Sequence, residues 1–383
     1  MSTAPETVED ADAGELAAAL REAPFVGVVS AANGDSLAAS GVLARALRER
    51  STPFQIRVDP VPDPLPGDGD DLVVGLGVTG GDLALAGHRR PASAAAAETA
   101  RELGVDPDPV LALAGVAAAD RPVGDAASLL EAAARRRTID RRPGVAIPTA
   151  DLAEGLAHST LVHAPQSGDP ELAEETLAAL GVSVEPSDEG HRRLASWLAI
   201  EASTSSSSRA AEAVERALRP HAIPDGRFAT VEGFGDVLDA AAREQPGAGV
   251  ALAIRDGAER RSAVLDAWRA HATGTHTALA DATTGRYDGV FVARVADEDP
   301  GRLGTIARLC RDFRSPEPVV LVVADDAAAA ASTSGVALGR TMAEARRSVD
   351  ADGQSRGGPR RATATFDDTV EVSRLITAFR EAL

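Results

Sequence analysis

Short runs of apolar residues alternate with helical segments along this chain, and this alternation is the feature that most restricts its fold. The first run, residues 25–30, leads through a turn of small residues into a helical segment at about 36–50, which has Leu and Val near one face. Further short runs occur at 72–75 and 83–86. Parallel strands need long, usually helical, connections. The alternation therefore predicts an α/β fold with a parallel sheet in its N-terminal part.

The second half of the chain returns to the same rhythm after a mostly helical stretch at 125–222. Four consecutive serines at 205–208 indicate an exposed connector. The later candidate strands are 228–231, 250–254, 289–295, 319–323 and 362–366, and the later candidate helices are 263–270, 304–313 and 370–382. We expect two α/β lobes joined by a helical connector, with the first lobe at 1–200, the connector at 201–222 and the second lobe at 223–383.

The charge of the chain is strongly unbalanced. It has 58 Asp and Glu against 39 basic residues, all of them Arg, and its formal net charge is −19. An acidic chain normally avoids nucleic acid, because affinity for phosphate comes from Lys and Arg. The Lys-free, Ala-rich, aromatic-poor composition is, however, typical of extreme halophiles, and at about 1 M salt the Debye length is only about 3 Å. The charge thus indicates a halophilic habitat, with an ordinary acidic cytosolic protein as the alternative.

Several protein classes are excluded or disfavoured by the sequence. No run of 18 or more apolar residues exists, which argues against a membrane helix and a membrane partner. The acidic N-terminus does not resemble a signal peptide, and the single cysteine, Cys310, excludes intramolecular disulfides and multi-cysteine metal sites. We expect a cytoplasmic protein in which Cys310 is a buried core residue. His158 and His163 are interpreted as surface or hydrogen-bonded core residues.

A glycine motif after the third apolar run has two interpretations. Gly75, Gly77 and Gly80 match the Gly-x-Gly-x-x-Gly pattern of dinucleotide-binding loops. Such a loop should open a helix, whereas the residues that follow read as another strand. The pattern therefore favours a plain glycine turn, and the absence of Lys excludes a Walker phosphate-binding loop.

Residues 30–47 resemble the first motif of the DHH phosphoesterase superfamily in its RecJ-like branch, where a strand ends in His-x-Asp-x-Asp-Gly before a helix of small residues. The His of that motif falls on Ala31, the first Asp on Asn33, the second on Asp35 and the Gly on Ser36. Only one carboxylate of the motif is retained.

The later motifs of the superfamily follow in the expected order. Residues 71–77 resemble its second Asp-bearing strand, with Gly75 at the Asp position. The sequence from Gly87 to Pro91 resembles the Asp-His-His signature and keeps only His88. Residues 111–120 resemble the fourth motif, with Asp120 as its Asp, and residues 158–170 resemble the end of the archaeal RecJ-like core.

The C-terminal part resembles the DHHA1 domain of the same proteins. Residues 357–364 resemble its nucleic-acid-binding loop, Gly-Gly-His-x-x-Ala-Ala-Gly, with Pro359 in place of the His, and residues 302–323 resemble the helix and strand before it. The resemblance thus covers nearly the whole chain. It implies a DHH-like first lobe at 1–200 and a DHHA1-like second lobe at 223–383.

The departures from the motifs bear on the chemistry that the resemblance implies. RecJ-like enzymes hydrolyse phosphodiesters with two divalent metals, typically Mn²⁺, and a bridged metal pair needs several carboxylate and imidazole ligands. The retained positions are Asp35, His88 and Asp120. We therefore predict no metal or other cofactor and no cleavage, with Mn²⁺ or Mg²⁺ required only if a residual site is active. Asp35 would then cap the helix at 36–50, and His88 would be a loop residue.

The resemblance also suggests partners, because inactive members of the superfamily serve beside MCM and GINS in replicative helicases. We expect binding to single-stranded DNA or RNA, or to replication or repair proteins of the GINS and MCM type. The candidate nucleic-acid-binding residues, which would face a cleft between the lobes, are Arg89, Arg90, Gly357, Gly358, Arg360 and Arg361.

Three alternatives stay open. The Arg-rich stretch at 135–142 is either a phosphate-binding cluster or a solvated helix end that pairs with nearby acids. The protein is alternatively an active metal-dependent 5′–3′ single-strand exonuclease or phosphoesterase, or a scaffolding subunit without nucleic-acid contact.

Overall fold

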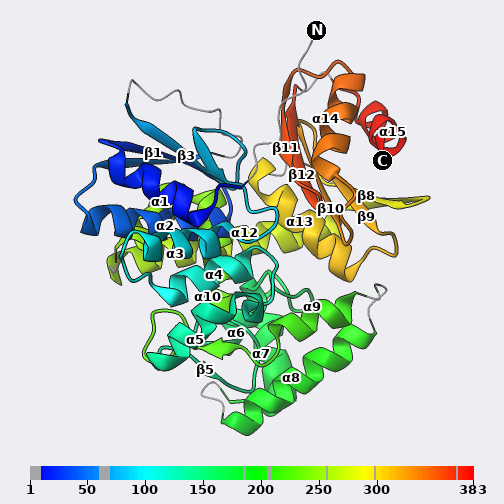
Figure 1. The fold of residues 1–383 in the computed structure, drawn as a ribbon. Helices are drawn as coiled ribbons and strands as arrows, with labels where there is room; N and C mark the ends of the chain where they lie inside the picture. Colours follow the sequence, from blue (N-terminus) through cyan, green and yellow to red (C-terminus); the bar gives the residue numbers. More distant parts are fainter. Residues whose placement is uncertain are drawn as a thin grey trace. The chain divides into compact units, whose positions relative to one another are not determined.

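The computed structural model describes residues 10–59, 70–183, 187–204, 207, 209–255, 258–296, 299–367 and 370–383. Three of the four serines of the predicted connector, Ser205, Ser206 and Ser208, lie outside the described residues. The chain forms two compact units (Figure 1): the first comprises residues 1–142, 146–149 and 220–268, and the second comprises 143–145, 150–219 and 269–383. These units are interleaved along the chain, whereas the predicted lobes are consecutive segments, so the boundaries at 200 and 223 stay a prediction.

The first unit contains the parallel sheet that the sequence predicts. Its strands are β1 (Val26–Ala31), β2 (Phe54–Asp59), β3 (Leu72–Leu76) and β4 (Leu83–Leu85), in the order β2-β1-β3-β4 and all parallel. β1 lies inside the sheet and is almost fully buried, whereas the edge strand β2 alternates between half-buried and exposed positions. The carboxyl ends of β1 and β3 therefore lie side by side, where the first two predicted motifs meet.

Small residues let the helices of the first unit pack closely. These helices are α1 (Ala13–Glu22), α2 (Gly34–Glu49), α3 (Ala92–Glu102), α4 (Pro109–Ala118), α5 (Ala127–Arg135), α10 (Val231–Glu244) and α11 (Pro246–Ile254). A Cβ at Gly115 of α4 would collide with the Ser93 side chain of α3, and one at Gly41 of α2 would collide with Ala253 of α11. Close helix approach thus helps to fill the core of a chain in which only 3% of residues are aromatic.

Short elements complete the first unit and connect it along the chain to the second. A 3-10 helix (Val123–Ala126) precedes α5, and β5 (Asp140–Arg141) pairs antiparallel with β6 (His221–Ala222). Helix α12 (Ala258–Asp281) begins in the first unit and ends in the second.

The second unit contains a mixed six-stranded sheet. Its strands are β7 (Thr283–Tyr287), β8 (Val290–Arg294), β9 (Val319–Val323), β10 (Ala327–Ser332), β11 (Gly353–Gly357) and β12 (Arg361–Phe366), in the order β11-β12-β10-β9-β8-β7. Only β8 and β9 are parallel. Its helices are α6 (Leu152–His158), α7 (Pro170–Ala179), α8 (Asp188–Ser203), α9 (Ala210–Ala217), α13 (Pro300–Phe313), α14 (Leu338–Ser348) and α15 (Val372–Ala382).

Both faces of this sheet are buried at its central strands β9 and β10. Leu321 and Val323 of β9 belong to the apolar cluster that includes α14 and α15. Val320 and Val322 are also buried and, because successive strand side chains alternate, point to the opposite face, where α13 packs on β9 and β10. The two-part α/β architecture is thus confirmed.

Two predicted strands are wrong. Residues 228–231 form a loop that ends at the start of α10, because the Thr230 side chain accepts a hydrogen bond from Gly233 N and caps that helix. Residues 250–254 belong to α11, which starts at Pro246, where a fixed φ favours the first helical turn. Short buried apolar runs do not distinguish strand from helix by periodicity.

No helix among the described residues is long and apolar enough to cross a membrane. Cys310 lies buried on α13, as predicted, and burial raises the pKa of its thiol to about 12. A thiol that stays protonated at neutral pH is a poor nucleophile.

Candidate functional site

The first predicted motif lies where β1 ends and α2 begins. Ala31 is the last residue of β1, and Asn33 caps α2, because its side-chain oxygen accepts a hydrogen bond from Ser36 N at 3.0 Å. Gly34 N, the first N–H of the helix, donates to Oδ1 of Asp239 on α10 at 2.8 Å. Protein groups therefore occupy N–H groups that would attract an anion at an open helix N-terminus.

Asp35 is a buried side chain that joins two helices. Only 7% of Asp35 is exposed, and its carboxylate accepts hydrogen bonds from Ala92 N at 2.7 Å and from Ser93 N at 2.9 Å. These N–H groups begin α3, whose own N-cap residue, Pro91, makes no side-chain cap. The prediction that Asp35 caps the helix at 36–50 is thus wrong. Asn33 holds that position in the turn, and Asp35, at the start of the helix itself, reaches α3 instead.

Gly75, which stands at the Asp position of the second motif, has no space for a side chain. A Cβ on Gly75 would collide with the carbonyl oxygen of Gly80, and a Cβ on Gly77 would collide with Oγ of Ser36 at the start of α2. Gly77 also has a φ of +67°, which L side chains rarely adopt. The glycine motif therefore runs from β3 into a loop at 77–82 that leads to the parallel strand β4 without a helix, and Gly77 packs against Ser36 of α2. This agrees with the interpretation as a glycine turn rather than a dinucleotide-binding loop.

The other residual positions do not add a ligand set. His88 is an exposed loop residue, and Asp120 follows the end of α4 with a φ of +61°. Across the part of the chain that the structure describes, no group of three or more His, Cys, Asp or Glu side chains is arranged to hold a metal ion. The residues present therefore do not fit the two-metal centre that the superfamily motif implies.

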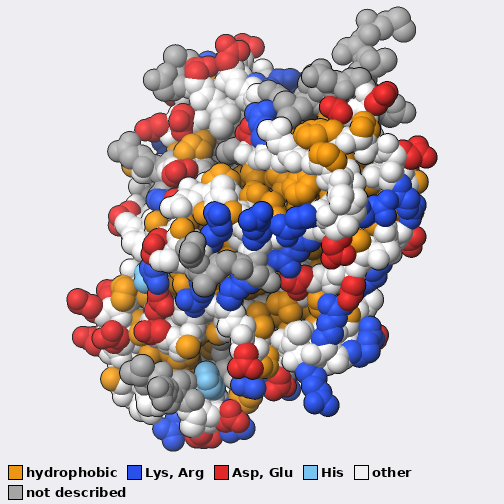
Figure 2. Space-filling view, turned by 90° about the vertical axis from the view of Figure 1, so that its left-hand side faces the viewer, with side chains coloured by type: hydrophobic (Ala, Val, Ile, Leu, Met, Phe, Trp, Pro, Cys, Tyr) orange, Lys and Arg blue, Asp and Glu red, His pale blue; other side chains and the backbone are white. Residues whose placement is uncertain are grey.

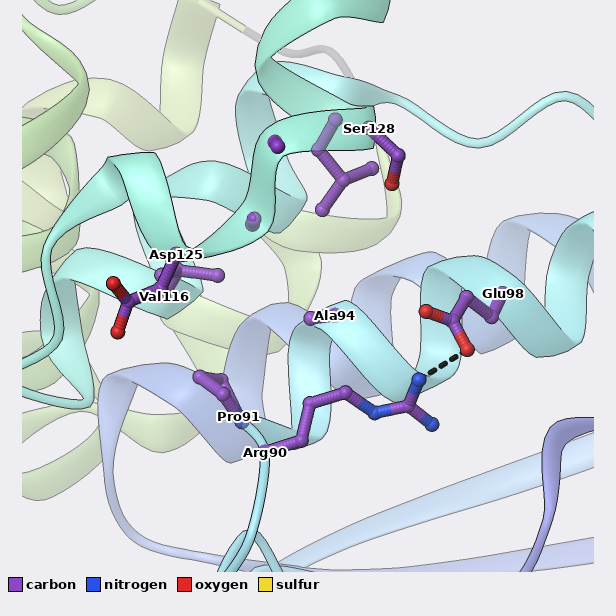
Figure 3. A pocket seen from close by; sticks show the side chains of 10 residues that line it. Arg90, Pro91, Ala94, Glu98, Val116, Asp125 and Ser128 are labelled. Atoms are coloured by element: carbon purple, nitrogen blue, oxygen red, sulfur yellow. Dashed lines mark hydrogen bonds and ion pairs between the residues drawn. The ribbon is translucent and has the colours of Figure 1, made fainter.

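Arg90 lines a small pocket in the first unit (Figure 3). Arg89 is exposed, whereas Arg90 is half-buried and ion-paired with Glu98 of α3. The pocket has a volume of about 270 Å³. Its lining comes from the start of α3, from Val116 of α4 and from the region around the start of α5.

The Arg-rich stretch at 135–142 is mostly neutralised by neighbouring acids. Arg135 pairs with Glu131 at 3.7 Å, Arg136 pairs with Asp106, and Arg142 pairs with Asp140 at 3.0 Å. This pattern agrees with a solvated helix end rather than with a phosphate-binding cluster.

Other arginines of the first unit bind the ends of helices. Arg21 donates to the carbonyl of Glu102 at the end of α3, and Arg48 donates to the carbonyl of Ile254 at the end of α11. Cationic groups are favourable at helix C-termini, where carbonyl groups lack partners. Figure 2 shows Arg side chains interspersed with carboxylates on one face, and every blue side chain there is Arg because the chain has no Lys. Exposed Arg side chains in this chain thus often stabilise helix ends.

The predicted DHHA1-like loop forms the turn between β11 and β12. A Cβ on Gly357 would collide with the carbonyl oxygen of Arg361, so the tight turn requires glycine there. The carbonyl oxygens of Gly358 and Pro359 accept hydrogen bonds from Gly339 N at 3.0 Å and from Val336 N at 3.1 Å. These bonds fix the turn against the start of α14.

Two exposed arginines lie at this turn. Arg360 is in the turn itself, and Arg340 is on α14 next to Gly339, which the turn contacts. Neither guanidinium forms an ion pair with another described residue. Arg361, at the start of β12, is half-buried. We call Arg340 and Arg360 the hairpin pair. Sequence analysis missed Arg340, because only the contact between α14 and the turn places it there.

A buried histidine pair lies elsewhere in the second unit. Nδ1 of His163 is 3.2 Å from Nδ1 of His276, and Nε2 of His276 is 3.1 Å from the carbonyl oxygen of Ser159. Burial, with the Arg314 charge as a smaller cause, lowers the pKa of His163 to about 4. Burial also lowers the pKa of His276 to about 3, so both rings are neutral near pH 7. His158, whose Nδ1 is 3.0 Å from the carbonyl of Glu154, is likewise a hydrogen-bonded core residue, as predicted.

Comparisons with solved structures define the class of fold. RecJ from Thermus thermophilus in complex with Mn²⁺ matches 98% of this chain with a TM-score of 0.54 and 16% identity, and this chain spans 55% of that protein. CDC45 from Entamoeba histolytica matches with a TM-score of 0.62 and 9% identity over 96% of this chain and 97% of its own. An exonuclease RecJ bound to manganese matches with a TM-score of 0.51 and 15% identity over 99% of this chain and 95% of its own. The chain thus has a RecJ-like fold.

One relative by sequence covers the whole chain. "Uncharacterized protein rrnAC1427" of Haloarcula marismortui is 50% identical over 387 residues, which include 100% of both proteins. Residues 282–381 also match the family model "Uncharacterized protein rrnAC1427, C-terminal domain". The chain belongs to the family of this Haloarcula protein.

Proposed function

We propose that this protein is a RecJ-like protein that binds single-stranded nucleic acid without cleaving it. The observation that carries the proposal is the closure of the superfamily's metal-binding positions by the chain itself. The Asp35 carboxylate is engaged by two N–H groups of α3, and the carbonyl oxygen of Gly80 leaves no space for a side chain at Gly75 in β3.

Loss of hydrolysis follows from the chemistry of a two-metal site. Two bridged cations need several anionic ligands, and each must present free oxygen lone pairs toward the metal. Asp35, whose two oxygens each accept an N–H group of α3, could supply at most one of these ligands. Gly75 supplies no second carboxylate near the end of β3, and no group of three ligand residues stands among the residues that the structure describes.

Strand binding is assigned to arginines at the motif positions. Arg guanidinium groups bind phosphate through two hydrogen bonds and stack on bases. In the second unit the hairpin pair supplies two such groups, and Gly357 and Gly358 allow the tight turn that carries Arg360. Arg89, Arg90 and Arg361 are further candidates, and the strand is DNA or RNA.

A second candidate function is a subunit role beside replication or repair proteins of the GINS and MCM type. The match to CDC45 favours it, because that match extends over nearly the whole length of both proteins. The alternative of an active 5′–3′ exonuclease rests on the similar fold of RecJ, which was crystallised with Mn²⁺ or Mg²⁺.

Binding and its dependence on salt test the proposal. Fluorescence anisotropy of labelled single-stranded DNA and RNA, in a series of salt concentrations, should show saturable binding. The double variant Arg340→Ala, Arg360→Ala should weaken binding to all sequences and should reduce the slope of log K against log salt by about 1.4, since each phosphate contact to a single strand contributes about 0.7. The control is Arg135→Ala, which removes an exposed but acid-paired Arg. Unchanged affinity and slope in the double variant would contradict the role of the hairpin pair.

A further inference from the structure

The pocket beside Arg90 is a defined recess within the first unit. Its volume of about 270 Å³ is just below the range of about 300–1,000 Å³ that is common for small-molecule sites. A recess of this size suits one planar ring system better than a complete nucleotide. It is lined by the start of α3, the same helix start that Asp35 holds and that follows the degenerate Asp-His-His segment.

The walls of the pocket are apolar on several sides. Pro91 and Ala94 come from the start of α3, Val116 comes from α4, and Leu129 comes from α5. Side chains of this kind contact the faces of a flat ring by dispersion and remove apolar surface from water. They offer no charge that would hold a phosphate.

One edge of the pocket carries both donors and acceptors. Arg90 and Glu98 form an ion pair in which 40% and 43% of the two side chains stay exposed. Figure 3 shows this pair along one side, with Ser128 on a separate helix. A guanidinium has five N–H donors and a carboxylate about four acceptor positions, so the pair keeps unused hydrogen-bonding capacity.

We propose that this pocket takes a single unstacked base of the bound strand and prefers guanine. The inference rests on the proposed binding of single strands. On the Watson–Crick edge of guanine, O6 accepts a hydrogen bond, as from Arg90, and the adjacent N1–H and N2 amino group donate, as to Glu98. Thymine has no amino group and offers the carboxylate only its N3–H, so it makes one hydrogen bond fewer. An apolar side chain of a partner protein would fill the walls but would leave both charged groups unused.

Strand affinity with and without guanine tests the inference. Fluorescence anisotropy compares a labelled oligothymidine with the same strand carrying isolated guanines, at one fixed salt concentration. We expect the guanine strand to bind roughly fivefold more tightly to the natural protein. Glu98→Gln, which keeps the size of the side chain, and Ala94→Phe, which fills the pocket, should both remove this preference and should leave oligothymidine binding within about twofold. Arg135→Ala is the control, and circular dichroism establishes that each variant is folded.

The possible failures are distinguishable. Equal affinity for both strands in the natural protein, or a guanine preference that persists in Glu98→Gln, overturns the pocket inference and leaves strand binding intact. Absence of binding to either strand overturns the proposed function, and the pocket inference with it. If Ala94→Phe changes neither affinity but abolishes capture of a protein partner, the pocket is a protein-docking site and the inference is wrong.

Discussion

Replacing Asp35 tests whether this residue is a structural cap or a remnant metal ligand. Asp35→Ala removes both acceptors of the N–H groups that start α3 and leaves those groups buried beside an apolar side chain. A hydrogen bond to a charged group contributes about 1.5–3 kcal/mol. Loss of a cap costs about 0.5–2 kcal/mol. Because the two bonds are coupled, we expect the free energy of unfolding to fall by about 3 kcal/mol rather than by their sum.

Two further variants calibrate this value. Asp35→Asn keeps one acceptor oxygen and should lose about half as much stability. Asp12→Ala removes another N-cap in the same unit, but Asp12 is exposed and accepts one bond, from Gly14 N at 2.8 Å. Its expected loss is about 1 kcal/mol. Urea unfolding followed by circular dichroism, at one high salt concentration, measures all three.

The sign of the effect decides between the two roles. A carboxylate kept for a metal site is usually unfavourable to the metal-free fold, so its removal stabilises the protein. An unchanged or increased free energy of unfolding for Asp35→Ala would therefore refute the capping argument. A loss no larger than that of Asp12→Ala would refute the magnitude.

Three further predictions concern a substitution at Gly75 and the dependence of stability on pH and on salt. Gly75→Asp puts an Asp at the motif position, but its Cβ collides with Gly80, so the free energy of unfolding should fall by about 1–3 kcal/mol and no Mn²⁺-dependent cleavage should appear. The control, Gly124→Asp, lies at an unobstructed position and should be nearly neutral. A Gly75→Asp variant that is stable and cleaves strands would contradict this prediction. In the folded protein the pKa values of His163 and His276 are about 4 and 3, below the usual 6.5. The unfolded chain therefore binds more protons as pH falls, and the free energy of unfolding should decrease below about pH 6.5. If the urea midpoint of His163→Asn depends on pH as steeply as that of the natural protein, these groups are not the cause. With a net charge of −19, the thermal midpoint should rise between about 0.15 and 2 M NaCl as repulsion is screened, and an unchanged midpoint would contradict the interpretation of the acidic surface.

The sequence predicted the parallel sheet well because β1, β3 and β4 are short apolar runs, and because a clear helix follows β1. It did not predict β10, whose sequence is five Ala and one Ser. Ala strongly favours helices, but this segment is fully buried between β9 and β12, and tertiary packing overrides the local preference. The same limit explains residues 250–254, where a buried run became a helix.

The sequence predicted which metal-ligand positions lack a charged side chain, but it did not predict the hydrogen-bond partners of the site residues. The order of the motifs placed Ala31, Asn33 and Gly75 at expected metal-ligand positions. None of these residue types supplies a charged ligand. The partners of Asp35 on α3 lie 57 and 58 residues away in the sequence, and Asp239 lies 205 residues from Gly34. Pairings at such separations depend on how helices pack, and no local pattern encodes them. Arg340 was missed because the packing of α14 against the turn, and no local pattern, places it beside Arg360.

Incubation of 5′-labelled single strands with the purified protein, molar salt and Mn²⁺ tests the central claim most directly. The closed metal-binding positions predict that the strand stays full-length over hours while anisotropy shows it bound, and that Mg²⁺ gives the same result. Progressive shortening from the 5′ end that requires Mn²⁺ and disappears in a folded Asp35→Asn variant would contradict the claim that this RecJ-like protein has lost hydrolysis.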